Sequence, residues 1–367
     1  MKISNIICVL NWVKVLPFCL FAFLPLSAQT ALTKYQPGVT PEGAVYYLPK
    51  TSMRFVVKVE QTTYTPGEYA AYAERYLALH DTGLEPTVSY RVIGLSMTTV
   101  GEPDTAKCYS VKFNAKSAAS NMQLTEDGVL LTINAQATTP AALPAPFVPA
   151  RKPAVVNPRQ FLSEEILSAG STAKRAELIA QDIFTIRESK NQLTRGEADY
   201  MPQDGEQLRI MLARLDQQDE ALTRLFAGTT ISDTSEFVIS LCPMAEVKQQ
   251  VLFRLSQKTG LVDADDLSGE PFYLTVEDLH TVAPPVEEEG KKRKKAPESG
   301  IYVNVPGRIR VTVTQSLRTL LTSEFAAGQF GNVELLSGEL FNKRYTTHVW
   351  LNPVNGSVEK LEAEQPK

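Results

Sequence analysis

Residues 171–196, STAKRAELIAQDIFTIRESKNQLTRG, and residues 204–228, DGEQLRIMLARLDQQDEALTRLFAG, carry the clearest periodic pattern in the chain. Apolar side chains recur in both stretches at helical spacing, which predicts two amphipathic helices. The first stripe is Ala176, Ile179, Ile183, Ile186 and Leu193, and the second is Leu208, Leu212, Leu215, Leu222 and Phe226. Because only a short polar loop separates the stripes, we expect an antiparallel helical hairpin within residues 159–228.

The sequence on either side of this block alternates as strands do. Phe55, Val57 and Val59 are spaced two apart, and similar runs recur through residues 29–138 and 229–367. One helix interrupts the first region, since Thr65-Pro66-Gly67-Glu68 predicts a capped helix running to about Leu79. The expected fold class is therefore α+β, with two β-rich regions flanking the antiparallel helical hairpin.

Two segments of biased composition divide the chain further. Residues 139–158 contain six prolines, which predicts an extended, semi-rigid linker. Residues 287–295, EEEGKKRKK, place an acidic run directly before a basic one. Such a run could bind nucleic acid or lipid, but its mixed charge favours a solvated, mobile loop near residues 287–297.

The first 28 residues predict a secretory signal peptide. Lys2 and Lys14 precede an apolar run over residues 15–26, and the small residues Ser27 and Ala28 follow. A retained anchor helix and lipidation at Cys19 are the alternatives. We expect cleavage after Ala28 or Gln29 and export to the periplasm or outer membrane, with no transmembrane segment in the mature chain.

Charge and length limit the classes of partner and the number of domains. The chain has 37 basic and 41 acidic residues, and removing two lysines with the signal leaves 35 basic residues and a net charge of −6. This acidity argues against nucleic acid or an anionic membrane as the main partner. A length of 367 residues predicts two or three domains.

Two cysteines, Cys108 and Cys242, stay in the mature chain after the signal is removed. An even pair in an oxidising compartment predicts a possible disulfide between the two halves of the protein. The alternative is two separate thiols packed as small apolar groups.

Metal and cofactor signals are weak. His80, His280 and His348 lack the spacing of metal ligands, so no metal site, catalytic residue or cofactor-binding residue is assigned. The acidic run 263–270, DADDLSGE, suggests calcium but departs from the EF-hand pattern at its glycine and final glutamate positions. The alternative is a turn whose carboxylates accept backbone hydrogen bonds.

Two further surface features have competing interpretations. Tyr69, Tyr72 and Tyr76 share one helical face, which suits either a sugar-stacking platform or, more commonly, the buried side of a helix. Asp104-Thr105-Ala106 fits a short bacterial O-glycosylation signal.

Several segments of the chain resemble a family of secreted Bacteroidetes proteins known only as a domain of unknown function. The matching residues are 46–51 (YYLPKT), 66–70 (PGEYA), 73–77 (AERYL), 169–174 (AGSTAK), 186–188 (IRE), 196–202 (GEADYMP) and 263–269 (DADDLSG). The resemblance covers nearly the whole mature chain and implies a single family unit in a Gram-negative cell envelope. It implies no activity and carries no catalytic or binding residue to this sequence.

These observations favour a non-catalytic binding or assembly protein of the cell envelope, whose partner is an unknown envelope protein or glycan. The alternative is a carboxylate-dependent hydrolase acting on glycan or peptide. A deep cleft with two carboxyl groups roughly 5–10 Å apart would favour the hydrolase. A flat apolar surface or an open strand edge would favour binding.

Overall fold

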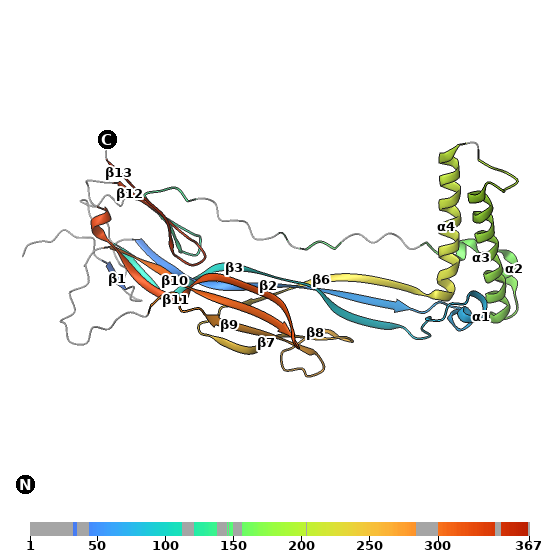
Figure 1. The fold of residues 1–367 in the computed structure, drawn as a ribbon, viewed down its shortest axis with the longest axis horizontal. Helices are drawn as coiled ribbons and strands as arrows, with labels where there is room; N and C mark the ends of the chain where they lie inside the picture. Colours follow the sequence, from blue (N-terminus) through green and yellow to red (C-terminus); the bar gives the residue numbers. More distant parts are fainter. Residues whose placement is uncertain are drawn as a thin grey trace, which may run out of the picture.

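The computed structural model describes residues 32–34, 44–111, 121–137, 145, 147–149, 156–202, 204–283, 300–341 and 346–365. The described residues are about 24% helix and 50% strand, in three antiparallel sheets and four α-helices, so the mixed composition is confirmed. The molecule is elongated, with long strands that carry the helices at one end and a small sheet at the other (Figure 1). Among the described helices, none combines the length and hydrophobicity needed to cross a membrane.

The first sheet has the order β1 (Leu32–Lys34), β3 (Thr87–Val111), β2 (Ala44–Thr65) and β6 (Thr229–Leu241). Strand β2 pairs with β3 on one side and, from Met53 to Thr65, with β6 on the other. Strand β6 follows the helical block in sequence, whereas β2 and β3 precede it. The two β-rich sequence regions therefore contribute strands to the same sheet.

The second sheet covers one face of the first. Its order is β11 (Arg318–Ser337), β10 (Gly300–Gln315), β9 (Glu270–Asp278), β7 (Val247–Ser256) and β8 (Gly260–Val262). Met53 and Phe55 of β2 pack against Leu274, Ile309 and Val311 of this sheet, and all five side chains are buried. The alternation that predicted a one-faced strand at residues 53–59 thus sets the inner face of a β-sandwich.

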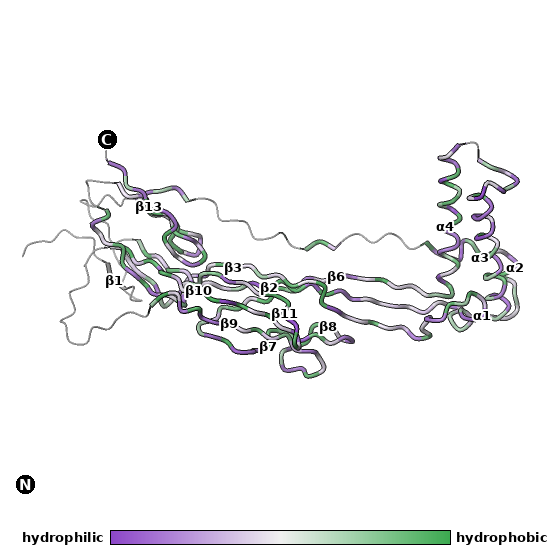
Figure 2. The backbone as a smooth tube through the Cα atoms, viewed as in Figure 1, coloured by the Kyte–Doolittle hydropathy of each residue, from purple (hydrophilic) through white to green (hydrophobic). Residues whose placement is uncertain are grey.

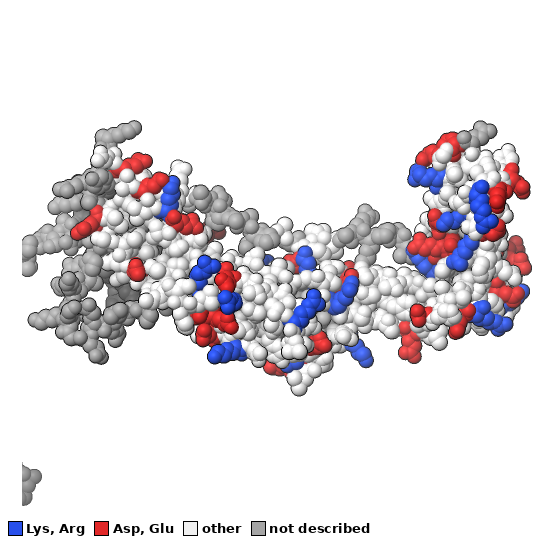
Figure 3. All heavy atoms as spheres, viewed as in Figure 1, with Lys and Arg blue, Asp and Glu red and all other residues white. Residues whose placement is uncertain are grey.

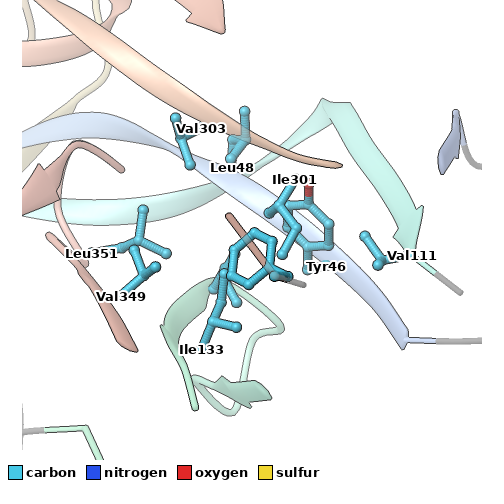
Figure 4. Close-up of a cluster of buried hydrophobic side chains, with 10 residues drawn as sticks. Tyr46, Leu48, Val111, Ile133, Ile301, Val303, Val349 and Leu351 are labelled. Carbon is cyan, nitrogen blue, oxygen red and sulfur yellow. The ribbon is translucent and has the colours of Figure 1, made fainter. Parts of the chain in front are cut away.

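The third sheet lies at the end opposite the helices. It has the order β13 (Val358–Glu364), β12 (Thr346–Leu351), β5 (Leu130–Ile133) and β4 (Met122–Leu124). Its core draws side chains from all three sheets (Figure 4), and these include Tyr46, Leu48, Ile133, Ile301, Val303, Val349 and Leu351. The Tyr46 hydroxyl accepts a hydrogen bond from the Tyr302 backbone N–H at 2.9 Å, and burial raises the pKa of that hydroxyl.

The helical head comprises residues 69–77 and 158–227 and stands at the far end of the β2, β3 and β6 strands. It contains short 3₁₀ turns at Ala70–Tyr72 and Pro158–Phe161 and the helices α1 (Ala73–Leu77), α2 (Glu164–Ser168), α3 (Thr172–Arg195) and α4 (Gly205–Ala227). Helix α3 begins at Ser171, whose hydroxyl accepts a hydrogen bond from the Lys174 N–H at 3.2 Å. Ion pairs from Arg187 to Asp219 and from Lys190 to Asp216 cross between α3 and α4, and their order shows that the two helices run antiparallel.

The head core involves only part of the predicted stripes. On α3, Ala176, Ile179, Ile183 and Leu193 are buried as predicted. On α4, Leu222 and Phe226 are buried, whereas Leu208, Leu212 and Leu215 are only half-buried. The first turns of α4 therefore extend beyond the core, and Ile210 and Met211 are exposed there.

The helix expected from Thr65 to about Leu79 is wrong in its start and length. Strand β2 continues through Thr65, which pairs with Thr229, and the helical residues begin only at Ala70. The Tyr69 N–H donates to the Leu225 carbonyl at 2.8 Å, so a tertiary hydrogen bond replaces the expected cap. Side-chain capping is a local preference, and sheet pairing overrides it here.

Several sequence predictions fall on residues outside the described part. The signal peptide over residues 1–28 and the charged loop near 287–297 lie there, as does most of the linker over 139–158. Of that linker, residues 145, 147–149 and 156–158 are described, and Pro158 begins the 3₁₀ turn at Pro158–Phe161.

Candidate functional site

The structure holds Cys108 and Cys242 as free thiols. Cys108 pairs with Tyr47 on one side of β2, while Cys242 follows Leu241, which pairs with Met53 on the other side. Strands rise roughly 3.3 Å per residue, so this arrangement exceeds the roughly 7 Å between Cα atoms that a bridge allows. Each thiol therefore lies in its own part of the first sheet, and burial raises the pKa of the Cys242 thiol.

The three histidines lie in separate parts of the molecule. His80 lies 3.4 Å from Glu74 in the helical head, and His280 lies 3.3 Å from Asp278 at the end of β9. His348 belongs to β12, where Nδ1 contacts the Asn134 carbonyl. Within the described ranges, no three His, Cys, Asp or Glu side chains are grouped so that they could hold a metal ion.

The acidic run over residues 263–269 forms a turn. Asp266 accepts a hydrogen bond from the Ser268 N–H at 2.9 Å, and this bond lowers the pKa of its carboxyl group. Arg254 donates to the carbonyls of Ala264 and Gly269 at 2.6 and 3.1 Å. This geometry agrees with the interpretation of a turn in which a carboxylate accepts a hydrogen bond from a backbone N–H group.

The tyrosine face belongs to the core of the helical head. Tyr69 is buried with its ring centroid 5.8 Å from that of Phe226, and Tyr72 and Tyr76 pack around the same core. The glycosylation signal lies in β3, where Asp104 is buried and Thr105 is exposed. Modification of Thr105 stays a prediction.

A groove on the outer face of the first sheet was not predicted from the sequence. It has a volume of about 450 Å³. Its walls come from β2, β3, β6 and the proline-rich segment, and they comprise Arg54, Val56, Thr98, Ala145, Phe147, Pro149, Thr234, Ser235, Glu236 and Val238. Arg54, Val56, Glu236 and Val238 lie on the face of the sheet opposite the sandwich core, and the sequence pattern marks them only as solvent-facing positions.

The groove combines an aromatic ring, a cation, a carboxylate and several hydroxyls. The Lys58 ammonium lies 5.4 Å from the centroid of the Phe147 ring, a distance typical of a cation–π contact. Glu236 of β6 lies opposite Lys58 in the pairing of β6 with β2. The Thr98 hydroxyl is buried and has no hydrogen-bond partner among the described residues, so it is a polar group that a ligand could satisfy.

This hydroxyl gives a test of the groove wall. The substitution Thr98→Val is expected to leave the free energy of unfolding unchanged or to raise it by up to about 1 kcal/mol, because it removes an unpartnered buried group. The matched control is Thr132→Val, which removes a buried hydroxyl that donates to the Ala135 carbonyl at 2.7 Å and should cost about 1 kcal/mol. Urea denaturation measures both, and an equal loss at Thr98 would show that its hydroxyl is already bonded.

Strand β6 borders the groove and forms an open edge of the first sheet. It is the last strand in the sheet order and pairs with β2 alone. The pairing runs from Thr229 to Leu241 without a bulge. The strand contains no proline, glycine, lysine or arginine, and Ile231, Phe237 and Val238 are exposed on it. Natural sheets commonly protect their edges with proline, lysine or bulges, and β6 has none of these, so within the described part of the chain β6 is an open edge.

The opposite side of the same sheet differs, because β1 pairs only with Tyr109–Val111 at the end of β3, and the rest of β3 forms the edge among the described residues. Strand β3 carries Arg91 and Pro103, and a register shift interrupts its pairing near Gly94. Its Tyr90 N–H donates to the Gln257 carbonyl at 2.9 Å, so the second sheet occupies part of this edge. Considering only the described residues, β6 is therefore the long edge that is open to a new strand.

Charge and hydropathy are mixed on the faces in view. Basic and acidic side chains are interspersed over the sandwich and the helical head (Figure 3). Hydrophobic and hydrophilic residues are mixed along β2, β3 and β6 (Figure 2). Recognition at β6 would therefore depend on the strand edge and the adjacent groove.

The fold defines a class of elongated protein in which antiparallel sheets carry a helical head. A family model described as a domain of unknown function, DUF4831, matches residues 42–359, so the chain belongs to this family. No curated protein and no solved structure matches the chain.

Proposed function

We propose that the protein is a non-catalytic binding or assembly protein of the Gram-negative cell envelope. The open edge of β6 carries this proposal. An unprotected strand of 13 residues presents backbone donors and acceptors that a partner can pair with, and it lies beside a groove with mixed polar and apolar walls. The ligand is an envelope protein or a glycan.

Export is part of the same proposal. The basic start, apolar run and small residues of positions 1–28 support a signal peptide, and the resemblance to secreted Bacteroidetes proteins supports an envelope location. The mature chain then acts in the periplasm or at the outer membrane.

The competing proposal is a hydrolase that uses two carboxylates. Hydrolysis of a glycoside by this route needs a pair of carboxyl groups across the scissile bond. Among the described residues that line the groove, Glu236 is the carboxylate, and Arg54 is the cation. This lining favours binding.

Expression in a Gram-negative host tests the proposal. N-terminal sequencing of the exported protein should begin near Gln29 or Thr30. The purified mature chain, screened against envelope glycans and peptides, should bind without releasing product. A start at Met1 in the membrane fraction would contradict export. Turnover that the substitution Glu236→Gln abolishes in a folded protein would establish the hydrolase instead.

A further inference from the structure

We propose that β6 binds an extended peptide segment of a partner protein, which adds to the first sheet as a new antiparallel strand. This inference rests on the proposed binding function and names the chemical class of the partner. Backbone hydrogen bonds to the free side of β6 would supply affinity, and alternate side chains would supply specificity.

The first argument is the consistency of the edge. In an antiparallel strand, residues alternate in the side toward which their backbone N–H and C=O groups point. Because β6 pairs with β2 without a bulge, about half of its residues direct these groups away from β2 in a regular series, and no other described strand pairs with that side. Added strands need such a series, since a bulge or proline would end the pairing.

The second argument comes from the groove residues. Thr234, Ser235 and Glu236 are consecutive and all line the groove, so the groove reaches the strand itself and not only one of its faces. A strand added beside β6 would place alternate side chains in the groove, between Glu236 and the Phe147 ring. Its other side chains would lie beside Phe237 and Ile239, on the face that continues into the sandwich core.

The third argument is charge. Strand β6 places Glu236 in the groove wall and contains no basic residue. Its known neighbour β2 places Lys58 opposite Glu236, with Val57 opposite Phe237 and Val56 opposite Val238. A partner strand of the same pattern, apolar at alternate positions and basic opposite Glu236, would repeat these cross-strand pairs on the free side.

Charge also argues against a second copy of β6 as the occupant. Antiparallel pairing of two β6 strands about Ser235 would set two Glu236 carboxylates diagonally on one face, and like charges at this spacing oppose pairing. A glycan would use the groove walls but would leave the backbone groups of the edge without partners.

The test uses a synthetic peptide that copies residues 54–63 of β2, RFVVKVEQTT, because this sequence already fits β6. Binding to the full mature protein is measured by fluorescence anisotropy, with a scrambled peptide of the same composition as control. We expect binding with a Kd in the micromolar to millimolar range, and the scrambled control should bind more weakly.

Two methylated peptides test the mode of binding. One carries N-methyl groups at its even-numbered residues and the other at its odd-numbered residues, with side chains unchanged. An added strand uses one set of N–H groups only, so one peptide should lose at least about tenfold in affinity while the other keeps it. Equal behaviour of the two methylated peptides, or no binding by the parent peptide, would overturn the inference.

A charge exchange tests the register. Glu236→Lys should weaken binding of the parent peptide about tenfold, and a peptide with glutamate in place of Lys58 should restore it. Glu188→Lys on α3, remote from β6, makes the same charge change and should have no effect. Loss of binding without restoration by the exchanged peptide would overturn the register.

Other occupants give distinct results. A dimer in sedimentation that Glu236→Lys changes, with no peptide binding, would identify a second copy as the occupant and overturn the inference. Binding of an envelope oligosaccharide that the peptide does not displace, again with no peptide binding, would overturn it while leaving the proposed binding function intact.

Discussion

Replacing Phe226 with alanine is expected to lower the free energy of unfolding of the helical head by about 3–5 kcal/mol, the usual cost of deleting a buried aromatic ring. Phe226 is 0% exposed and lies in the head core with Tyr69, Ile179 and Ile183. It also belongs to the last turn of α4, directly before the start of β6. Its loss leaves a cavity where the helices meet the long strands.

The matched control is Phe184→Ala in α3. Phe184 is 52% exposed, so its truncation should change the free energy of unfolding by about 0.5 kcal/mol or less. Urea unfolding followed by far-ultraviolet circular dichroism reports on the helices. Trp350 in β12 is the single tryptophan after residue 28, so in a protein that begins near Gln29 its fluorescence reports on the third sheet. We expect Phe226→Ala to shift the first signal more than the second, and equal shifts for the two phenylalanine variants would contradict this account.

The helices could be predicted from the sequence because their signals are local. Ser171 begins α3 and Gly196 ends it in a left-handed conformation with φ of 75°, as a short-range pattern indicates. Gly228 follows the last residue of α4 with φ of 77° and ψ of −168°, a conformation outside the left-handed helical region that glycine adopts readily. The head core followed from helical spacing on α3, but the half-buried Leu212 shows that a stripe does not tell how far the neighbouring helix extends.

The strand order could not be predicted in the same way. Alternation in β2 identified which side chains face the core, as Phe55 and Val57 confirm. It does not identify the neighbouring strand, and β6 lies more than 160 residues from β2 in sequence. Whether a strand lies at the edge or in the centre of a sheet depends on its neighbours. The open edge of β6 could therefore be identified only from the strand pairing in the structure.

The candidate groove escaped sequence analysis for a related reason. Arg54, Thr98, Phe147 and Glu236 come from four distant segments, and each is an ordinary surface residue in its own segment. The binding interpretation itself came from the sequence, and an open strand edge was the feature expected to favour it. What the sequence lacks is the sheet register that brings these side chains together.

The junction of the three sheets should be the most sensitive site to a buried charge. Asn304 of β10 is 1% exposed, and its amide donates to the Pro49 carbonyl at 2.8 Å and to the Asn355 carbonyl at 2.9 Å. Asn304→Asp keeps the shape of the side chain but replaces this donor with an acceptor. The carboxylate would then face two carbonyl oxygens, and we expect a loss of about 3–5 kcal/mol in the free energy of unfolding at pH 7.

The loss should depend on pH in a defined direction. Burial and the two carbonyls disfavour the charged form, so the pKa of the new carboxyl group should rise above its unfolded value of about 3.9. The destabilisation should therefore be small below about pH 4, where the protonated group can donate one hydrogen bond, and should grow as the pH rises toward the folded pKa. Guanidinium denaturation from pH 4 to 7 measures this trend.

The control is Asn332→Asp. Asn332 donates to the Ala283 carbonyl at 2.8 Å in an exposed setting, so this substitution should cost about 1 kcal/mol or less. A cost at Asn304 that is equal to the control, or that does not change with pH, would show that water reaches this junction and solvates the carboxylate.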